Sequence, residues 1–458
     1  MSADPHVFVV LGGTGDLAGR KLIPALHHVA PEDGCPIVGV GTRDHDQASY
    51  RAWAVERLRE AGAEGDLDTW VERLHYHQIG RGGFDLDGLA KHVGELEAEH
   101  DLPGNRVFYL ALPPQLFEDA IEGIDAAGLA DAAGWARLVI EKPFGTDTES
   151  AAHLDEVVHR CFDESSVFRI DHFLGKETVR NLLAFRFANP IFETTWNRDR
   201  IERVEVTVAE PLGVDGRAGY YDRAGVVRDM IQNHLTQVLS LIAMEPPIRF
   251  DADAIRDEKV KVLRAIEGVE RVVWGRYTAG EIDGESVPGY LDEDGVPDDS
   301  TTATFVEATV RIDNWRWQGV PFTVRTGKRL PSRTSTVDIQ FQRPPVHLFH
   351  ELDEQSDPTG NLLTITLQPD EGFDLCFEVK QPGNGMDLER MSLGFRYGDA
   401  FEPLPDAYET LVADVLEGDQ TLFVRSDEVA ESWRIWDPVA DPSGDLVEYP
   451  AGSWPETS

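Results

Sequence analysis

Short apolar runs alternate with stretches of helical periodicity through the first third of the chain. The runs at 7–11, 37–40, 107–112 and 138–140 have the pattern of buried strands, and 16–29, 47–62 and 86–99 have the spacing of helices. Strands that alternate with helices in this way predict a parallel, doubly wound sheet. Together with the glycine-rich turn at 12–17, this pattern predicts an α/β Rossmann-type dinucleotide-binding domain over residues 1–172.

The pattern changes in the rest of the chain. Helical spacing is found at 176–187 and 226–243, and a strand pattern at 204–208. Further alternating runs, which predict strands, occur at 304–312, 322–326, 337–341, 362–368 and 374–379. Residues 284–300 have the composition of a polar loop, and the tail after about 438 has no regular pattern. These features predict a larger α+β domain over residues 173–458, with a broad, mostly antiparallel sheet.

A glycine-rich turn joins the first predicted strand to the first helix. It comprises Gly12, Gly13, Thr14, Gly15, Asp16 and Leu17. Glycines at such a turn let a pyrophosphate approach the backbone, and the helix that follows directs its N–H groups at the phosphates. Arg43 follows the second strand, where an arginine accommodates the 2′-phosphate of NADP, but Asp44 beside it keeps NAD possible.

The charge balance excludes some partners. The chain has 83 acidic and 42 basic side chains, a formal net charge of −41, so we expect it to bind neither nucleic acid nor an anionic membrane. Its apolar stretches are too short for a membrane span, and no secretory signal is evident. The three cysteines favour neither a disulfide framework nor a cysteine zinc site. A cytoplasmic enzyme is expected, and the acidity suggests a salt-rich cytoplasm.

Three segments carry candidate chemistry. Lys142 in EKPFG follows a predicted strand, so it should point into the ligand crevice. His172, Lys176 and Arg180 recur every four residues; if this stretch is helical, they form a cationic stripe suited to phosphate. His234 lies on an apolar helix face, where a histidine is often only a core residue. Oxidation of an alcohol nevertheless needs a base, and a carboxylate to orient it.

Nine motifs resemble those of the glucose-6-phosphate dehydrogenase family and occur in the family's order across nearly the whole chain. They are GGTGDLAGRKLIPAL, NRVFYLALPP, EKPFG, RIDHFLGKE, RFANPIFETTWNRD, GYYDRAGVVRDMIQNHLTQVLSL, RTGKRL, QPDEG and LPDAYETL. RIDHFLGKE combined with the NHL helix is very specific to that family, whereas EKPFG alone is not. The resemblance implies oxidation of glucose 6-phosphate at C1 to the lactone, with NADP and without a metal. It also implies a homodimer or a dimer of dimers.

The same resemblance implies individual roles. His234 is the general base and Asp171 its orienting partner. His172 and Lys176 bind the 6-phosphate, and Lys142 lies near both the C1 oxygen and the cofactor. The further substrate-binding residues implied are Glu210, Asp229 and Lys328.

Three positions depart from the family pattern. Phe173 stands where the family usually has tyrosine, so one hydrogen bond to phosphate, worth roughly 1 kcal/mol, would be lost. Thr366 replaces an arginine that some animal members use for a second NADP, so we expect no such site. Asp44 is often a neutral residue in relatives.

The sequence also allows other functions. One alternative is a related dehydrogenase of another sugar phosphate, such as glucosamine 6-phosphate. A second is a sugar oxidoreductase that shares only the glycine turn and EKP, and a third is a catalytically silent dinucleotide sensor. The second would not need His172, Lys176 and His234 together, and the third would not need to keep Asp171 and His234.

Overall fold

The computed structural model describes residues 4–457 except 30–34, 81–82, 85, 215, 347, 349–359, 384–385 and 402–404. The chain forms two compact units. The first comprises Met1–Lys176, Arg249–Arg256 and Pro405–Ala430, and the second Glu177–Ile248, Asp257–Leu404 and Glu431–Ser458. Both units are therefore discontinuous in sequence, and the predicted boundary after residue 172 stays a prediction.

The first unit is built on a parallel sheet with strand order β3-β2-β1-β4-β5-β6, six strands in the described part of the chain. Its strands are β1 (Val7–Leu11), β2 (Ile37–Gly41), β3 (Leu74–Gln78), β4 (Arg106–Leu110), β5 (Ala136–Ile140) and β6 (Val167–Arg169). All five residues of β1 are buried, as expected of a central parallel strand. The predicted doubly wound sheet is confirmed. β3, which reads LHYHQ, escaped prediction because its residues are mostly polar.

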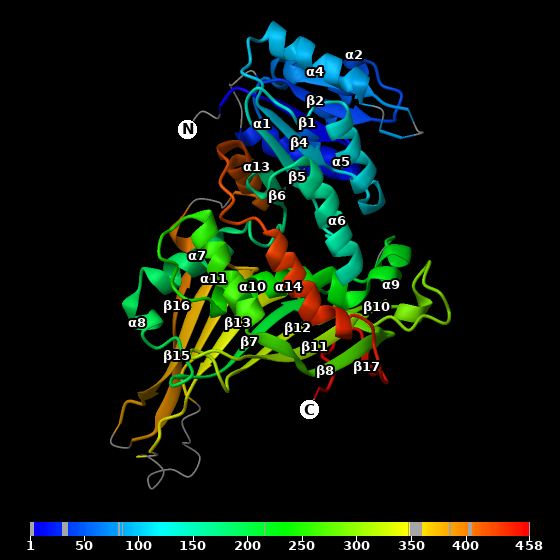
Figure 1. The fold of residues 1–458 in the computed structure, drawn as a ribbon. Helices are drawn as coiled ribbons and strands as arrows, with labels where there is room; N and C mark the ends of the chain where they lie inside the picture. The colour runs from blue at the N-terminus through cyan, green and yellow to red at the C-terminus, as the bar shows by residue number, and fades with distance from the viewer. Residues whose placement is uncertain are drawn as a thin grey trace. The chain divides into compact units, whose positions relative to one another are not determined.

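Helices pack around this sheet (Figure 1). They are α1 (Ile23–Val29), α2 (Gln47–Glu60), α4 (Asp87–Glu99), α5 (Phe117–Ala126), α6 (Thr148–Cys161) and α13 (Ala407–Glu417). Helix α13 comes from far along the sequence but contacts α1. Its Leu411, Val412 and Val415 belong to the same buried cluster as Phe8 and Leu26. Burial of this apolar face explains why a late segment of the chain completes the first unit.

The second unit contains a mixed sheet in which nine described strands follow the order β16-β15-β14-β13-β7-β12-β11-β8-β17. The strands are β7 (Ile201–Ala209), β8 (Ile266–Thr278), β11 (Phe305–Ile312), β12 (Pro321–Gly327), β13 (Thr334–Phe341), β14 (Leu362–Gln368), β15 (Gly372–Lys380), β16 (Leu388–Arg396) and β17 (Val447–Pro450). β7 pairs parallel with β12, β17 pairs parallel with β8, and the other neighbours are antiparallel. The predicted, mostly antiparallel sheet is confirmed.

Three details of the predicted elements were wrong. The loop predicted at 284–300 contains the short strand β10 (Glu285–Val287), which pairs with β9 (Gly280–Ile282). The tail after 438 is not irregular throughout, because β17 adds to the edge of the sheet. The helix predicted at 226–243 is divided into a π-helix, η5 (Val227–Leu235), and an α-helix, α10 (Thr236–Ala243). Helices α7 (Glu177–Phe187), η5 and α10 lie along the sheet, with η5 against β12 and α7 against β14 (Figure 1). Among the described helices, none has the length and apolar character that a membrane crossing requires.

Candidate active site

The glycine turn is packed so closely that side chains do not fit. The amide N–H groups of Gly12 and Gly13 both donate to the Val40 carbonyl, at 2.8 and 2.9 Å. A Cβ on Gly13 would lie 2.5 Å from the Cα of Gly39, and Gly12 has a φ of +90°. The first helical segment, η1, begins directly after the turn at Ala18. A bare backbone turn that leads into a helix is the cradle that a dinucleotide pyrophosphate needs.

Arg43 lies just beyond β2 with an exposed side chain. The Tyr76 hydroxyl donates a 2.7 Å hydrogen bond to the Arg43 carbonyl and so anchors the backbone of this segment to β3. Asp44 is also exposed. The structure therefore gives Arg43 the exposure that recognition of a 2′-phosphate requires.

Lys142 follows β5, at the carboxyl end of the parallel sheet, as predicted. Its neighbour Glu141 accepts a 2.5 Å hydrogen bond from the Tyr109 hydroxyl. Burial raises the pKa of Glu141 above its ordinary value, and it also raises the pKa of Tyr109 and Tyr408. Both phenols thus stay protonated and serve as donors beside Lys142. Sequence reasoning missed this support because Tyr408 comes from α13.

The RIDH segment leaves β6 and continues into a turn at 172–175, not into a helix. Asp171 is 1% exposed, and its Oδ1 accepts a 2.9 Å hydrogen bond from the Phe173 amide. Helix α7 begins only at Glu177, so the predicted helical stripe of His172, Lys176 and Arg180 is wrong. His172 and Lys176 gather instead around the Phe173 ring. The Lys176 Nζ lies 3.6 Å from the ring centroid, and the His172 ring lies 5.2 Å away.

Phe173 positions Lys176 through this cation–π contact. Such a contact is worth about 0.5–2 kcal/mol and needs only the aromatic face, which phenylalanine and tyrosine share. Phe173 therefore holds Lys176 in place as well as a tyrosine would, and only the hydroxyl is lost.

In the second unit, two parallel strands bring Glu210 and Lys328 together. Glu210 follows β7 and Lys328 follows β12, and the last residues of these strands pair with each other. The Lys328 Nζ lies 2.8 Å from the Glu210 carboxylate. The lysine side chain is only 6% exposed and lies 5.0 Å from the Tyr221 ring centroid. This is a preformed ion pair at the carboxyl ends of parallel strands, where ligands usually bind.

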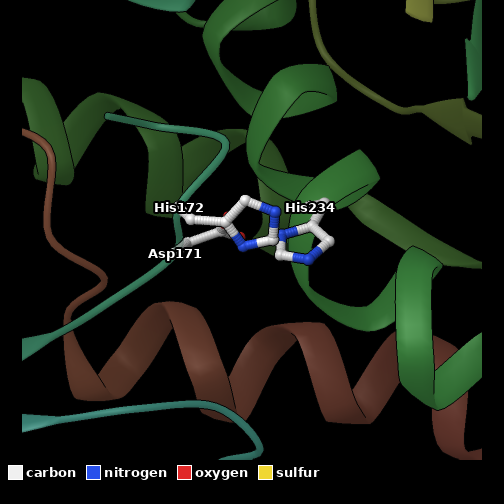
Figure 2. A group of neighbouring side chains, drawn as sticks. All are labelled: Asp171, His172 and His234. Carbon is white, nitrogen blue, oxygen red and sulfur yellow. The ribbon is translucent and has the colours of Figure 1, made fainter. Parts of the chain in front are cut away.

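The π-helix η5 carries Asp229 and His234, and Figure 2 shows the His234 side chain. An α-helix turns about 100° per residue, so residues five apart would diverge by about 140°. A π-helix closes i→i+5 hydrogen bonds and has more residues per turn, so residues five apart, such as Asp229 and His234, diverge less around its axis. His234 is 1% exposed. Asp229 contributes, after burial, to raising the pKa of Tyr220 and Tyr221.

Figure 2 shows Asp171 and His172 on the segment after β6, and His234 on η5. The structure thus places Asp171, His172, Lys176 and Lys142 in the first unit. It places His234, Asp229, Glu210 and Lys328 in the second. Tyr221, which contacts Lys328, was not predicted, although its place in the GYYD motif was a usable signal.

Comparisons with known proteins cover the whole chain. Residues 9–181 match the family model "Glucose-6-phosphate dehydrogenase, NAD binding domain", and residues 183–458 match the model of the C-terminal domain of the same family. A glucose-6-phosphate 1-dehydrogenase of Aggregatibacter actinomycetemcomitans is 43% identical over 478 residues, covering 100% of this chain and 95% of the relative. The Bacillus subtilis protein of the same name is 40% identical, covering 95% of this chain and 91% of its own.

Solved structures show the same family similarity as the sequence comparisons. The structure described as "Glucose-6-phosphate dehydrogenase in complex with its substrate glucose-6-phosphate" has a TM-score of 0.91 and 35% identity, covering 100% of this chain and 97% of that one. Glucose-6-phosphate 1-dehydrogenase from Mycobacterium avium has a TM-score of 0.85 and 34% identity, covering 99% and 96%. With both domain models matched and relatives this similar over their full length, the chain belongs to the glucose-6-phosphate dehydrogenase family.

Proposed function

We propose that this chain oxidises D-glucose 6-phosphate at C1 to 6-phospho-D-glucono-1,5-lactone, with NADP as the hydride acceptor. The observation that carries the proposal is the full-length similarity to an enzyme solved with glucose 6-phosphate. Two features of the second unit add support. The Glu210–Lys328 ion pair offers charged groups for the sugar hydroxyls, and the buried His234 on η5 offers a base. The reaction is the first step of the oxidative pentose phosphate pathway.

His234 is the proposed general base. Oxidation removes a hydride from C1 and a proton from the C1 hydroxyl, and the imidazole of His234 accepts that proton. The Asp171 carboxylate orients the imidazole and stabilises the imidazolium that results. The hydrogen bond from the Phe173 amide holds the Asp171 carboxylate in a fixed orientation for this task.

The remaining polar residues hold the sugar phosphate. His172 and Lys176 bind the 6-phosphate, and the Phe173 ring keeps Lys176 positioned for it. Glu210 and Asp229 accept hydrogen bonds from sugar hydroxyls. Lys328 binds the substrate while paired with Glu210, and Lys142 donates to the C1 oxygen.

The glycine turn, Gly12 to Leu17, holds the pyrophosphate of the cofactor, and Arg43 binds its 2′-phosphate. The turn fits a dinucleotide because Gly12 and Gly13 let it pack directly against the neighbouring backbone of Ala111 and Gly39, just before a helix begins. When bound, NADP supplies the nicotinamide that accepts the hydride. NAD also remains a usable cofactor, because Asp44 stands beside Arg43.

We further propose a cytoplasmic homodimer, or a dimer of dimers. Exposed apolar side chains on β16, Met391 and Leu393, support burial of this edge strand against a second copy. Light scattering of purified protein checks the mass. A monomer at micromolar concentration would refute the dimer.

The activity is tested by absorbance at 340 nm with glucose 6-phosphate and NADP or NAD, in low and in high salt. We expect a strong signal with NADP. His234→Gln should lower kcat by about 10²–10⁴-fold while calorimetry still detects substrate binding. His153→Gln is the matched control, because His153 is an exposed histidine that contacts Glu118.

Three outcomes would overturn parts of the proposal. Turnover of glucosamine 6-phosphate alone would refute the substrate. A signal with NAD alone would refute the role of Arg43. Full activity of His234→Gln would refute the base.

A further inference from the structure

Three histidines cluster in the first unit, and the proposed function uses none of them. His75 and His77 lie on β3, and His92 lies on α4. The His92 ring centroid is 5.9 Å from that of His75 and 5.7 Å from that of His77. We propose that these three imidazoles bind one divalent transition-metal ion such as Zn²⁺, with water as the fourth ligand.

The backbone sets up the cluster. Residues two apart on a strand point to the same face, so His75 and His77 both point toward α4. His92 contacts both rings. Gly88, near the start of α4, leaves His77 its space, because a Cβ there would lie 3.3 Å from the His77 Cε1.

The spacing from the His92 ring to each of the two strand histidines suits a shared ion. A zinc–nitrogen bond is about 2.0–2.1 Å, so a ligating ring has its centre about 3.2 Å from the metal. Tetrahedral geometry then separates two ring centres by about 5.2 Å. The observed separations, 5.7 and 5.9 Å, exceed that value by less than about 1 Å.

Binding requires the rings to turn. His92 is edge-on to His75, with an interplanar angle of 79°, and tilted by 44° against His77. The ring nitrogens of all three do not yet lie within 4.8 Å of one another. All three side chains are only half-buried, so they have both room to rotate and access to solvent.

The local charges allow a cation. Burial lowers the pKa of all three histidines, that of His75 to about 4, which keeps the imidazoles neutral and able to ligate at pH 7. Arg51 and His100 act against a cation near His75, and Glu95 favours one near His92. The Arg51 guanidinium donates to the carbonyls of Leu74 and Glu72, which fixes its position but leaves its charge. Imidazole ligands suit Zn²⁺, Ni²⁺ and Cu²⁺ rather than Mg²⁺ or Ca²⁺.

The test is titration of tag-free protein with Zn²⁺ by calorimetry and with Co²⁺ by visible absorption. We expect wild type to bind at least one ion, with Co²⁺ bands of a nitrogen-rich site. His92→Gln and His77→Gln should each weaken that site more than about tenfold. His153→Gln, an exposed histidine on α6, is the matched control and should bind like wild type.

A second readout separates this site from the dehydrogenase. His92→Gln should oxidise glucose 6-phosphate at the wild-type rate and keep the wild-type circular dichroism spectrum. If His92→Gln and His77→Gln bind Zn²⁺ and Co²⁺ as tightly as wild type, the proposed site is refuted. The same conclusion follows if wild type binds no more ions than His92→Gln. Neither result would bear on the proposed oxidation.

Discussion

Gly13→Ala tests the glycine turn most directly. The new Cβ would lie 2.5 Å from the Cα of Gly39 and 3.0 Å from the Val40 amide nitrogen. These neighbours are backbone atoms of β2, which cannot rotate away as a flexible side chain could. Favourable contacts between carbon atoms lie at about 3.5–4.0 Å, so the turn or the strand must shift by about 1 Å.

The expected cost follows from that overlap. Overpacking of a well-packed core typically costs about 1–3 kcal/mol, and a backbone-to-backbone clash belongs near the upper value. For a unit of about 200 residues, each kcal/mol shifts the unfolding midpoint by about 2–4 °C, so we expect a fall of about 6–12 °C. The NADP dissociation constant should rise at least tenfold, because the displaced turn no longer fits the pyrophosphate.

Gly94→Ala is the matched control. Gly94 is exposed in the interior of α4, and a Cβ there meets nothing within 4 Å. Alanine in a helix is favoured over glycine by about 0.5–1 kcal/mol, so this variant should be slightly more stable than wild type. The assay is thermal unfolding together with calorimetric titration of NADP. If both variants unfold alike, or if Gly13→Ala binds NADP normally, the reasoning about the turn is wrong.

Three further predictions concern charge. Glu210→Gln should lower the free energy of unfolding by about 1–3 kcal/mol, because it leaves the nearly buried Lys328 ammonium with a weaker partner. The same variant should raise KM for glucose 6-phosphate. Urea unfolding and initial rates measure the two effects, and an unchanged KM would contradict the prediction. The folded-state pKa of His75, about 4, lies below its ordinary 6.5, so the folded state resists protonation. Stability should therefore be constant above pH 6.5 and fall between pH 6.5 and 4, and His75→Gln should flatten that slope in denaturant titrations. Because the net charge is −41, activity and unfolding temperature should rise from dilute buffer to about 1 M KCl, where the Debye length is about 3 Å; full stability in dilute buffer would refute this.

Local patterns were sufficient to predict the elements that form the proposed cofactor site. The apolar run that became β1, the glycine turn after it and the lysine after β5 were all placed correctly. A buried parallel strand must be apolar, and a tight turn against a neighbouring backbone must be glycine, so both constraints appear in the sequence within a few residues. Motif resemblance then supplied the proposed roles of Asp171 and His234, which periodicity alone could not assign.

Other features were decided only in three dimensions. Glu210 and Lys328 are far apart in sequence and meet because β7 and β12 pair in parallel. Tyr408 supports Glu141 because α13 buries its apolar face in the first unit. The π-helical pitch of the segment that carries Asp229 and His234 leaves no periodic signature. The stretch from His172 to Lys176 is not helical, so the four-residue spacing of its cationic residues does not form a helix face. Periodicity reports which face of one segment is buried, whereas strand pairing, helix docking and changes in helical pitch depend on the free energy of contacts between segments, which no local pattern contains.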